Sequence, residues 1–94
     1  MAFSVTDIEA LATHVRATDD ELIVDLADGR KSSVPLVWFP RLLHATPEQR
    51  QRYEFIGDGE GIHWPEVDED ISVRGLILGL PSIEYQRGQR KRAR

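Results

Sequence analysis

Six carboxylates and one histidine lie close together in the middle of the sequence, between Gly57 and Ile71. Three glycines alternate with acids at the start of this segment, a His-Trp-Pro run follows, and no basic side chain interrupts it. Clusters rich in carboxylate oxygens suit hard cations such as Ca²⁺ or Mg²⁺. Such a site, binding a cation or serving a cation-dependent hydrolase, is one alternative, and its weak candidate ligands are Asp58, Glu60, Asp68 and Asp70.

The spacing of these acids fits a calcium-binding loop only in part. An EF-hand loop counted from Asp58 needs glycine at position 6 and glutamate at position 12. Position 12 is Glu69, but position 6 is His63. We therefore assign no metal ligand and expect no cofactor, and the simpler interpretation is that these acids are solvated turn residues and a helix N-cap.

Histidine is the side chain best suited to proton transfer near neutral pH, so His63 could form an acid-base pair with a neighbouring carboxylate. A catalytic site also needs a nucleophile or bound water and groups that stabilise charge. The sequence contains no cysteine, no Gly-x-Ser-x-Gly, no P-loop and no His-Glu-x-x-His motif. We predict a non-enzymatic protein in which His63 packs in a hairpin, with one ring nitrogen bonded to a carboxylate or backbone group.

The glycine-rich segment is expected to be the turn of a hairpin. Aromatic and β-branched residues flank it, which predicts strands over 53–56 and 62–64 joined by a turn with positive φ angles at glycine. Pro65 ends the second strand because it lacks a backbone donor.

Three further strands are predicted in the first half of the chain. Alternating residues indicate strands over 14–18, 22–26 and 30–36, and Asp28-Gly29 is a strong hairpin signal between the last two. A capping-box pattern predicts a short helix over 7–12 before them.

Short helices are predicted in the second half. Large apolar residues three to five apart favour a helix over 38–45, and Thr46-Pro47 begins another over 47–52. A third begins after Asp70 or Ser72 and ends at Gly79, with an apolar stripe of Val73, Leu76, Ile77 and Leu80. The acidic run would then lie at a helix N-terminus. The fold class is therefore α+β: a small antiparallel sheet, made of a meander plus the glycine-rich hairpin, packed against two or three short helices.

Charge divides the sequence into two parts. Residues 1–86 hold seven Lys/Arg and sixteen Asp/Glu, a net charge of −9, whereas residues 87–94 hold five basic residues and no acid. We expect one domain over 1–81 and a flexible basic tail over 82–94. The two charged ends could attract each other within a molecule or between copies, and the tail could also bind nucleic acid weakly. Its basic residues are Arg87, Arg90, Lys91, Arg92 and Arg94.

The N-terminus shows neither a signal peptide nor a long apolar run, so a cytoplasmic protein without membrane contact is expected.

Three aromatic residues could belong either to the core or to an interface, because Trp side chains anchor both: Trp38, Phe39 and Trp64. Arg41 follows Trp38 and Phe39 closely in the sequence and could reach a carboxylate of the central acidic run.

The sequence resembles the domain-of-unknown-function 2442 family of small bacterial proteins over about residues 12–80. The resemblance rests on residues 28–30, 34–42, 45–48, 57–65 and 68–73. It implies a small α+β fold of an antiparallel sheet and short helices, without an established activity. It also implies an antitoxin-like partnership with a small protein encoded nearby. Some family members carry an added helix-turn-helix domain. This sequence has the basic tail instead.

We therefore predict a protein-protein interaction module that binds another small protein, with a homo-oligomer as an alternative. The predicted partner-binding residues are Trp38, Phe39, Arg41, Asp58, Glu60, His63 and Trp64.

Overall fold

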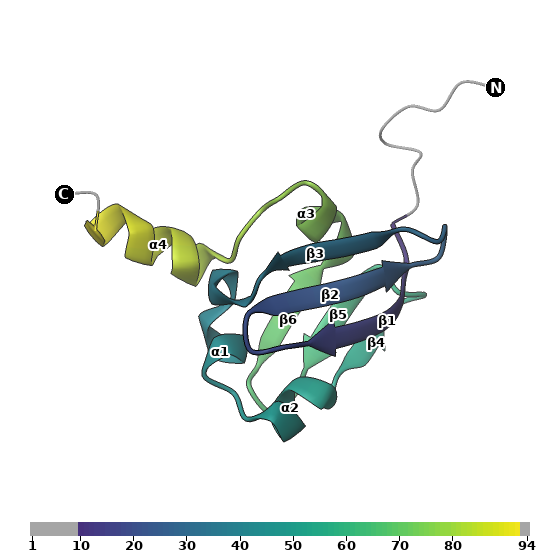
Figure 1. Ribbon diagram of the computed structural model, residues 1–94, viewed down its shortest axis with the longest axis horizontal. Coiled ribbons are helices and arrows are strands. Elements are labelled where there is room, and N and C mark those ends of the chain that lie inside the picture. The colour runs from purple at the N-terminus through teal and green to yellow at the C-terminus, as the bar shows by residue number, and fades with distance from the viewer. Residues whose placement is uncertain (1–9, 93–94) are drawn as a thin grey trace.

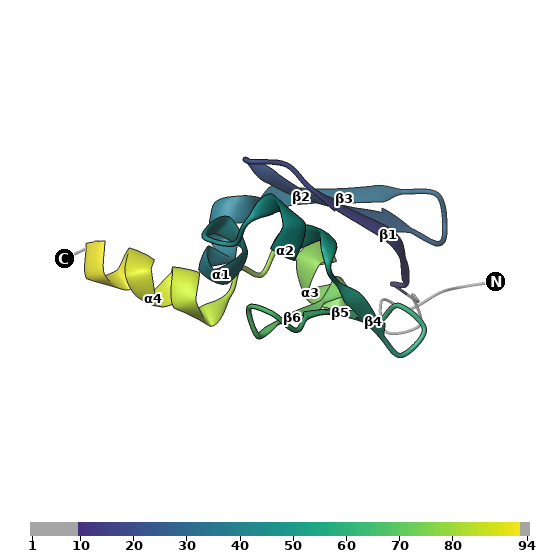
Figure 2. The same ribbon diagram turned by 90° about the horizontal axis from the view of Figure 1, so that it is seen from below.

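Two three-stranded antiparallel sheets face each other, with short helices between and beside them (Figures 1 and 2). The computed structural model describes the backbone of residues 10–92 and the side chains of residues 10–89. The predicted α+β class is confirmed, although the meander and the glycine-rich hairpin form two separate sheets rather than one. Among the described residues, none of the helices is long and apolar enough to span a bilayer.

The first sheet is the predicted meander, with strand order β1-β2-β3. Its strands are β1 (Ala12–Ala17), β2 (Glu21–Leu26) and β3 (Lys31–Pro35). In β2, alternate residues from Leu22 to Leu26 are buried, as the period-two pattern predicts. The turn between β2 and β3 has Gly29 at φ 94°, which confirms the hairpin expected at Asp28-Gly29.

The second sheet contains the predicted glycine-rich hairpin and one strand that the sequence did not suggest. Its order is β4 (Glu54–Ile56), β5 (Gly61–Trp64) and β6 (Glu69–Ser72). Gly57 and Gly59 have positive φ angles of 63° and 108°, as the turn requires.

Strand β6 excludes Asp70 as the cap of the third helix and leaves Ser72, the other predicted cap. Glu69 and Ile71 face inward while Asp70 and Ser72 face outward, so the segment has the period of a strand. The acidic run therefore occupies a turn and a strand, and it does not lie at a helix N-terminus. The cap is Ser72, whose hydroxyl accepts a hydrogen bond from the Gly75 N–H at 3.2 Å.

The remaining elements are helical and short. The predicted helix over 38–45 is divided at Phe39, whose φ of −127° interrupts it, and the capping box expected at Thr46 and Gln49 is present. Of the helix expected over 7–12, residues 7–9 lie outside the described residues, Ala10 and Leu11 have no regular structure, and Ala12 begins β1. The helices are η2 (Leu36–Trp38), α1 (Pro40–Leu43), α2 (Pro47–Gln51), α3 (Val73–Ile77) and α4 (Ile83–Arg92).

Helix α4 occupies the segment for which we expected no regular structure, and it extends away from the two sheets (Figure 1). Ser82 begins it: the hydroxyl accepts from the Tyr85 N–H at 3.1 Å and donates to the Trp38 carbonyl at 2.6 Å. This cap attaches the helix to η2. The polar sequence concealed the helix because its first turn depends on contacts with residues far away in the chain.

Aliphatic side chains from both sheets and from α1 and α3 form the core, and Trp64 is the largest side chain fully buried in it. At one edge the two sheets touch through backbone atoms. The Ala12 N–H donates to the Gly59 carbonyl at 2.8 Å, so β1 lies directly against the β4–β5 turn. This contact leaves no room for a side chain at Gly59.

Gly59→Ala should therefore destabilise the fold more than the matched substitution Gly29→Ala. A Cβ at Gly59 would lie 2.5 Å from the Ala12 carbonyl oxygen, whereas a Cβ at Gly29 would have no atom within 4 Å. Both glycines have positive φ. We expect Gly29→Ala to cost about 1 kcal/mol and Gly59→Ala about 2–4 kcal/mol, because the second adds a clash to the backbone strain. Urea unfolding measures both, and equal losses would contradict the close approach.

Candidate functional site

Two of the predicted partner-binding aromatic residues belong to the core. Phe39 is 3% exposed, and Trp64 is fully buried with its indole N–H donating to the Arg50 carbonyl at 3.0 Å. Trp38 is half-buried and packs against the same core. Phe39 and Trp64 therefore present no ring surface to a partner, which corrects that part of the prediction. A domain this small needs large side chains to fill its interior.

The carboxylates that the sequence placed together are separated by the fold and point to different partners. Glu66 pairs with Arg52 at 2.7 Å, and Asp70 bonds the Nδ1 atom of His63. Asp58 and Glu60 are exposed in the β4–β5 turn. Within residues 10–89, no three His, Asp or Glu side chains are placed to hold a metal ion.

His63 lies on the outer face of the second sheet. It stands directly between Glu54 of β4 and Asp70 of β6 in the strand register, which brings its ring to the Asp70 carboxylate. The structural role expected for His63, a ring nitrogen bonded to a carboxylate, is confirmed. Of this row of polar side chains, only Asp70 also lines one of the two cavities that we describe below.

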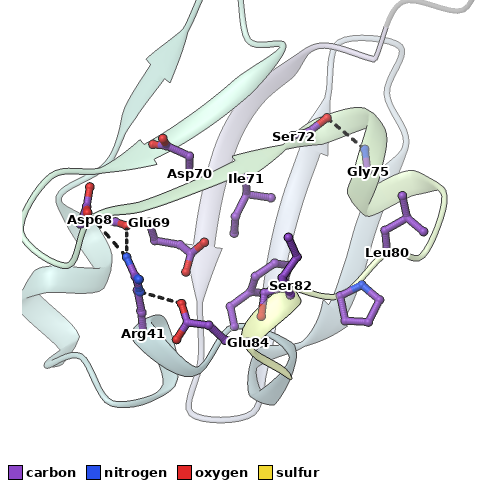
Figure 3. Close-up of a pocket in the computed structure, with 13 residues that line it drawn as sticks. Arg41, Asp68, Glu69, Asp70, Ile71, Ser72, Gly75, Leu80, Ser82 and Glu84 are labelled. Carbon is purple, nitrogen blue, oxygen red and sulfur yellow. Dashed lines mark hydrogen bonds and ion pairs between the residues drawn. The ribbon is translucent and has the colours of Figure 1, made fainter. Parts of the chain in front are cut away.

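Arg41 connects three segments of the chain, as Figure 3 shows. Its guanidinium donates to the Asp68 carbonyl at 2.7 Å, lies 3.6 Å from the Asp68 carboxylate, and pairs with Glu84 at 2.7 Å. The contact with Asp68 confirms the expectation that Arg41 reaches the acidic run. Asp68 supports this geometry with a positive φ of 53° in the β5–β6 turn. Arg41 thus holds α1, this turn and the first turn of α4 together.

An acidic groove of about 510 Å³ opens beside these contacts. The inner edge of β6 and the segment from Leu80 to Glu84 form its two sides, and Arg41 lies at one end. A second hollow of about 560 Å³ lies between β1 and α2. There the Arg50 guanidinium is already bonded to the Leu42 and Leu43 carbonyls, so the acidic groove is the stronger candidate.

Glu69 is the unusual group in the acidic groove. It is 9% exposed, because it faces inward opposite Trp64 in the strand register. Its carboxylate points toward Arg41 and Glu84 (Figure 3). No side chain among the described residues donates a hydrogen bond to it. Burial raises the pKa of Glu69 above its ordinary value, the Glu84 charge raises it further, and Arg41 acts in the opposite direction.

Four large aliphatic side chains around the end of α3 are exposed, between 40 and 65%. We call this set the aliphatic loop; it consists of Ile77, Leu78, Leu80 and Ile83. The expected apolar stripe is only half correct: Val73 and Leu76 are buried, but Ile77, the last residue of α3, and Leu80 beyond it are exposed.

Sequence reasoning therefore missed both Glu69 and the aliphatic loop as parts of one site. The alternation of Glu69 and Ile71 with outward Asp70 and Ser72 carried a signal for the strand. From the sequence alone, Gly79 is interpreted only as the end of a helix. The structure places Arg87 exposed on α4. The candidate nucleic-acid side chains from Arg90 onward lie outside the described side chains, and Arg94 lies wholly outside the description.

Two facing three-stranded sheets with short helices at their ends define a small α+β domain. The chain belongs to the family described as "Protein of unknown function (DUF2442)", whose profile matches residues 12–82. All of α4 lies beyond that match.

Two solved structures have the same fold. A crystal structure of a protein of unknown function from Rhodospirillum rubrum is 31% identical, with a TM-score of 0.69, over 80% of this chain and 93% of that one. The solution structure of the uncharacterized protein CV0863 from Chromobacterium violaceum is 24% identical, with a TM-score of 0.67, over 84% of this chain and 75% of that one. No curated protein sequence matches the chain.

Glu69→Gln should stabilise the fold at neutral pH, and the gain should shrink in acid. The pKa of Glu69 is higher in the folded than in the unfolded chain, so the ionised group opposes folding at neutral pH. As the pH falls through the folded pKa, wild-type Glu69 binds a proton and recovers stability that the variant already has. Urea unfolding in dilute solution at neutral pH and near the ordinary glutamate value of 4.5 checks this.

The exposed Glu21→Gln variant is the control, and it should leave the pH dependence as in the wild type. A Glu69→Gln protein that is less stable than the wild type at neutral pH would contradict this prediction, because it would show that the groove stabilises the ionised carboxylate.

Proposed function

We propose that the protein is a non-enzymatic interaction module that binds another small protein, as an antitoxin-like partner does. The observation that carries this proposal is the aliphatic loop. Four large aliphatic side chains lie within seven residues of sequence and all are at least 40% exposed. Soluble proteins rarely leave contiguous apolar surface open to water, and such patches mark interaction sites.

The aliphatic loop is held in place by its own backbone. The Leu80 N–H donates to the Gly75 carbonyl and the Gly79 N–H to the Leu76 carbonyl, both at 3.0 Å. Gly79 has a φ of 76°, so this is the helix ending that a left-handed glycine makes. A loop fixed in this way loses little conformational freedom on binding, which favours affinity.

The segment around Trp38 and Arg41 supports this surface from beneath. The Trp38 carbonyl accepts hydrogen bonds from both the backbone and the hydroxyl of Ser82, and Arg41 pairs with Glu84. The β4–β5 turn lies at the opposite end of the molecule from α4 (Figure 2). We therefore place the partner on the aliphatic loop, with Trp38 and Arg41 as its support, and leave Asp58 and Glu60 outside this contact.

Co-expression with the product of the neighbouring gene tests the proposal. We expect a complex of fixed stoichiometry in size-exclusion chromatography with light scattering. Leu78→Glu should weaken this complex at least about tenfold, because it puts a charge into an apolar contact. Leu78 is 57% exposed, so the variant should fold.

Ile56→Glu is the matched control, since Ile56 is 47% exposed on β4 and lies outside the aliphatic loop. It should bind as the wild type does. The proposed surface is wrong if Leu78→Glu binds with unchanged affinity, and the proposed function is wrong if the wild type forms no complex.

A further inference from the structure

The acidic groove carries more negative charge than its one cation can balance. Four carboxylates line it, against the single guanidinium of Arg41. That guanidinium directs its N–H groups to Asp68 and Glu84. Asp70 has its own partner in His63 on the other face of the strand. The four acids are Asp68, Glu69, Asp70 and Glu84.

Glu69 is the carboxylate of the acidic groove that lacks a side-chain hydrogen-bond donor. Its side chain is more than nine-tenths buried and points into the groove, and no described side chain donates a hydrogen bond to it (Figure 3). The backbone of Asp70 and the charge of Arg41 stabilise the ionised carboxylate, but burial and Glu84 outweigh them. A buried carboxylate that is compensated only in part costs free energy, which a further cation placed beside it would recover. Leu80 and Ile83 line the same groove and are 55 and 65% exposed. Aliphatic walls with a carboxylate at the base suit an arginine or lysine, whose methylene stem is apolar and whose end is charged.

The chain itself contains a segment with this chemistry. Residues 87–94 hold five basic residues and no acid, against a net charge of −9 for the rest. Most of this segment is the second half of α4, whose first residues line the acidic groove. The helix runs away from the two sheets (Figures 1 and 2). At 1.5 Å per residue, a straight helix of this length carries its end roughly 13–15 Å from its start. The basic end of α4 therefore lies far from the groove of its own chain.

We propose that the protein self-associates by a reciprocal contact, in which the basic end of α4 of one copy lies in the acidic groove of a second copy. Two α4 helices side by side and antiparallel bring each acidic groove to the basic end of the partner helix. The arrangement has twofold symmetry, so both contacts form at once. It also gives α4 a packing partner, and a helix of ten residues is marginal in water without one.

This contact goes beyond the proposed function, because it needs no second protein. The two surfaces share Leu80 and Ile83, but Leu78, which tests the binding of another protein, does not line the acidic groove. The two proposals can therefore fail separately.

Sedimentation equilibrium of the full chain tests the self-association. We expect a dimer at about 50 mM salt whose Kd rises at least about tenfold at about 500 mM, where the Debye length is only roughly 4 Å. Glu69→Gln should raise the Kd at low salt at least about fivefold. So should a tail variant with Arg87→Gln, Arg90→Gln, Lys91→Gln and Arg92→Gln. The variant that combines both changes should raise the Kd by less than the product of the two separate increases, because both changes remove the same contact.

Asp58→Asn is the matched control, because it removes the same charge from the exposed β4–β5 turn. It should leave the Kd within about twofold of the wild type. The urea unfolding of Glu69→Gln proposed above also serves as the check that this variant is folded.

Several results would overturn the proposal. One is a wild-type chain that stays monomeric at low salt, and another is a dimer whose Kd does not respond to Glu69→Gln or to the tail variant. A monomeric chain that binds an unrelated lysine- and arginine-rich peptide through Glu69 would assign the acidic groove to another protein. A monomeric chain whose tail binds short duplex DNA would assign the tail to nucleic acid.

Discussion

The indole N–H of Trp64 donates to the Arg50 carbonyl, and the Arg50 guanidinium in turn donates to the carbonyls that end α1, those of Leu42 and Leu43. These bonds connect β5 to α2 and α2 to α1 through groups that are almost wholly buried. A buried indole N–H needs an acceptor, and the last carbonyls of a helix need donors. Both requirements are met in one place, so the two helices have one position relative to the second sheet. The position of Arg41 follows, because it lies on α1.

The acidic groove is a consequence of this arrangement. With α1 fixed, Arg41 reaches the Asp68 carbonyl across the β5–β6 turn and the Glu84 carboxylate at the start of α4. The strand register that buries Trp64 places Glu69 opposite it, on the inner face. An acid at an inward position breaks the usual pattern of a strand, and such exceptions concentrate at functional sites. The same register thus gives the domain its core and buries one carboxylate to which no described side chain donates a hydrogen bond.

The features that could be predicted from the sequence are those whose causes lie within a few residues. The alternation around Val24, the Asp28-Gly29 turn and the Thr46 capping box each act locally, and the structure has all three. Helix α4 could not be predicted, because its start is fixed by Trp38 and Arg41, which lie far away in the sequence. Strand β6 pairs with the neighbouring β5 and its alternation was a local signal, but the acid Glu69 at an inward position concealed it. Of the site, only the reach of Arg41 to the acidic run could be predicted. Whether an aromatic ring such as Trp64 is buried depends on the facing sheet, which composition does not show.

Free energy connects the features that the single chain leaves unbalanced. The aliphatic loop exposes apolar surface, Glu69 is buried without a side chain that donates a hydrogen bond to it, and α4 has only its first turn anchored to the body. Each of these raises the free energy of the isolated folded chain, and each is relieved by contact with another surface. They lie side by side, so one association could relieve several of them together. A partner that binds the folded state and not the unfolded state stabilises the folded chain by mass action. On the proposals made above, the stability of this domain therefore rises with the concentration of its partners as well as with the quality of its own core.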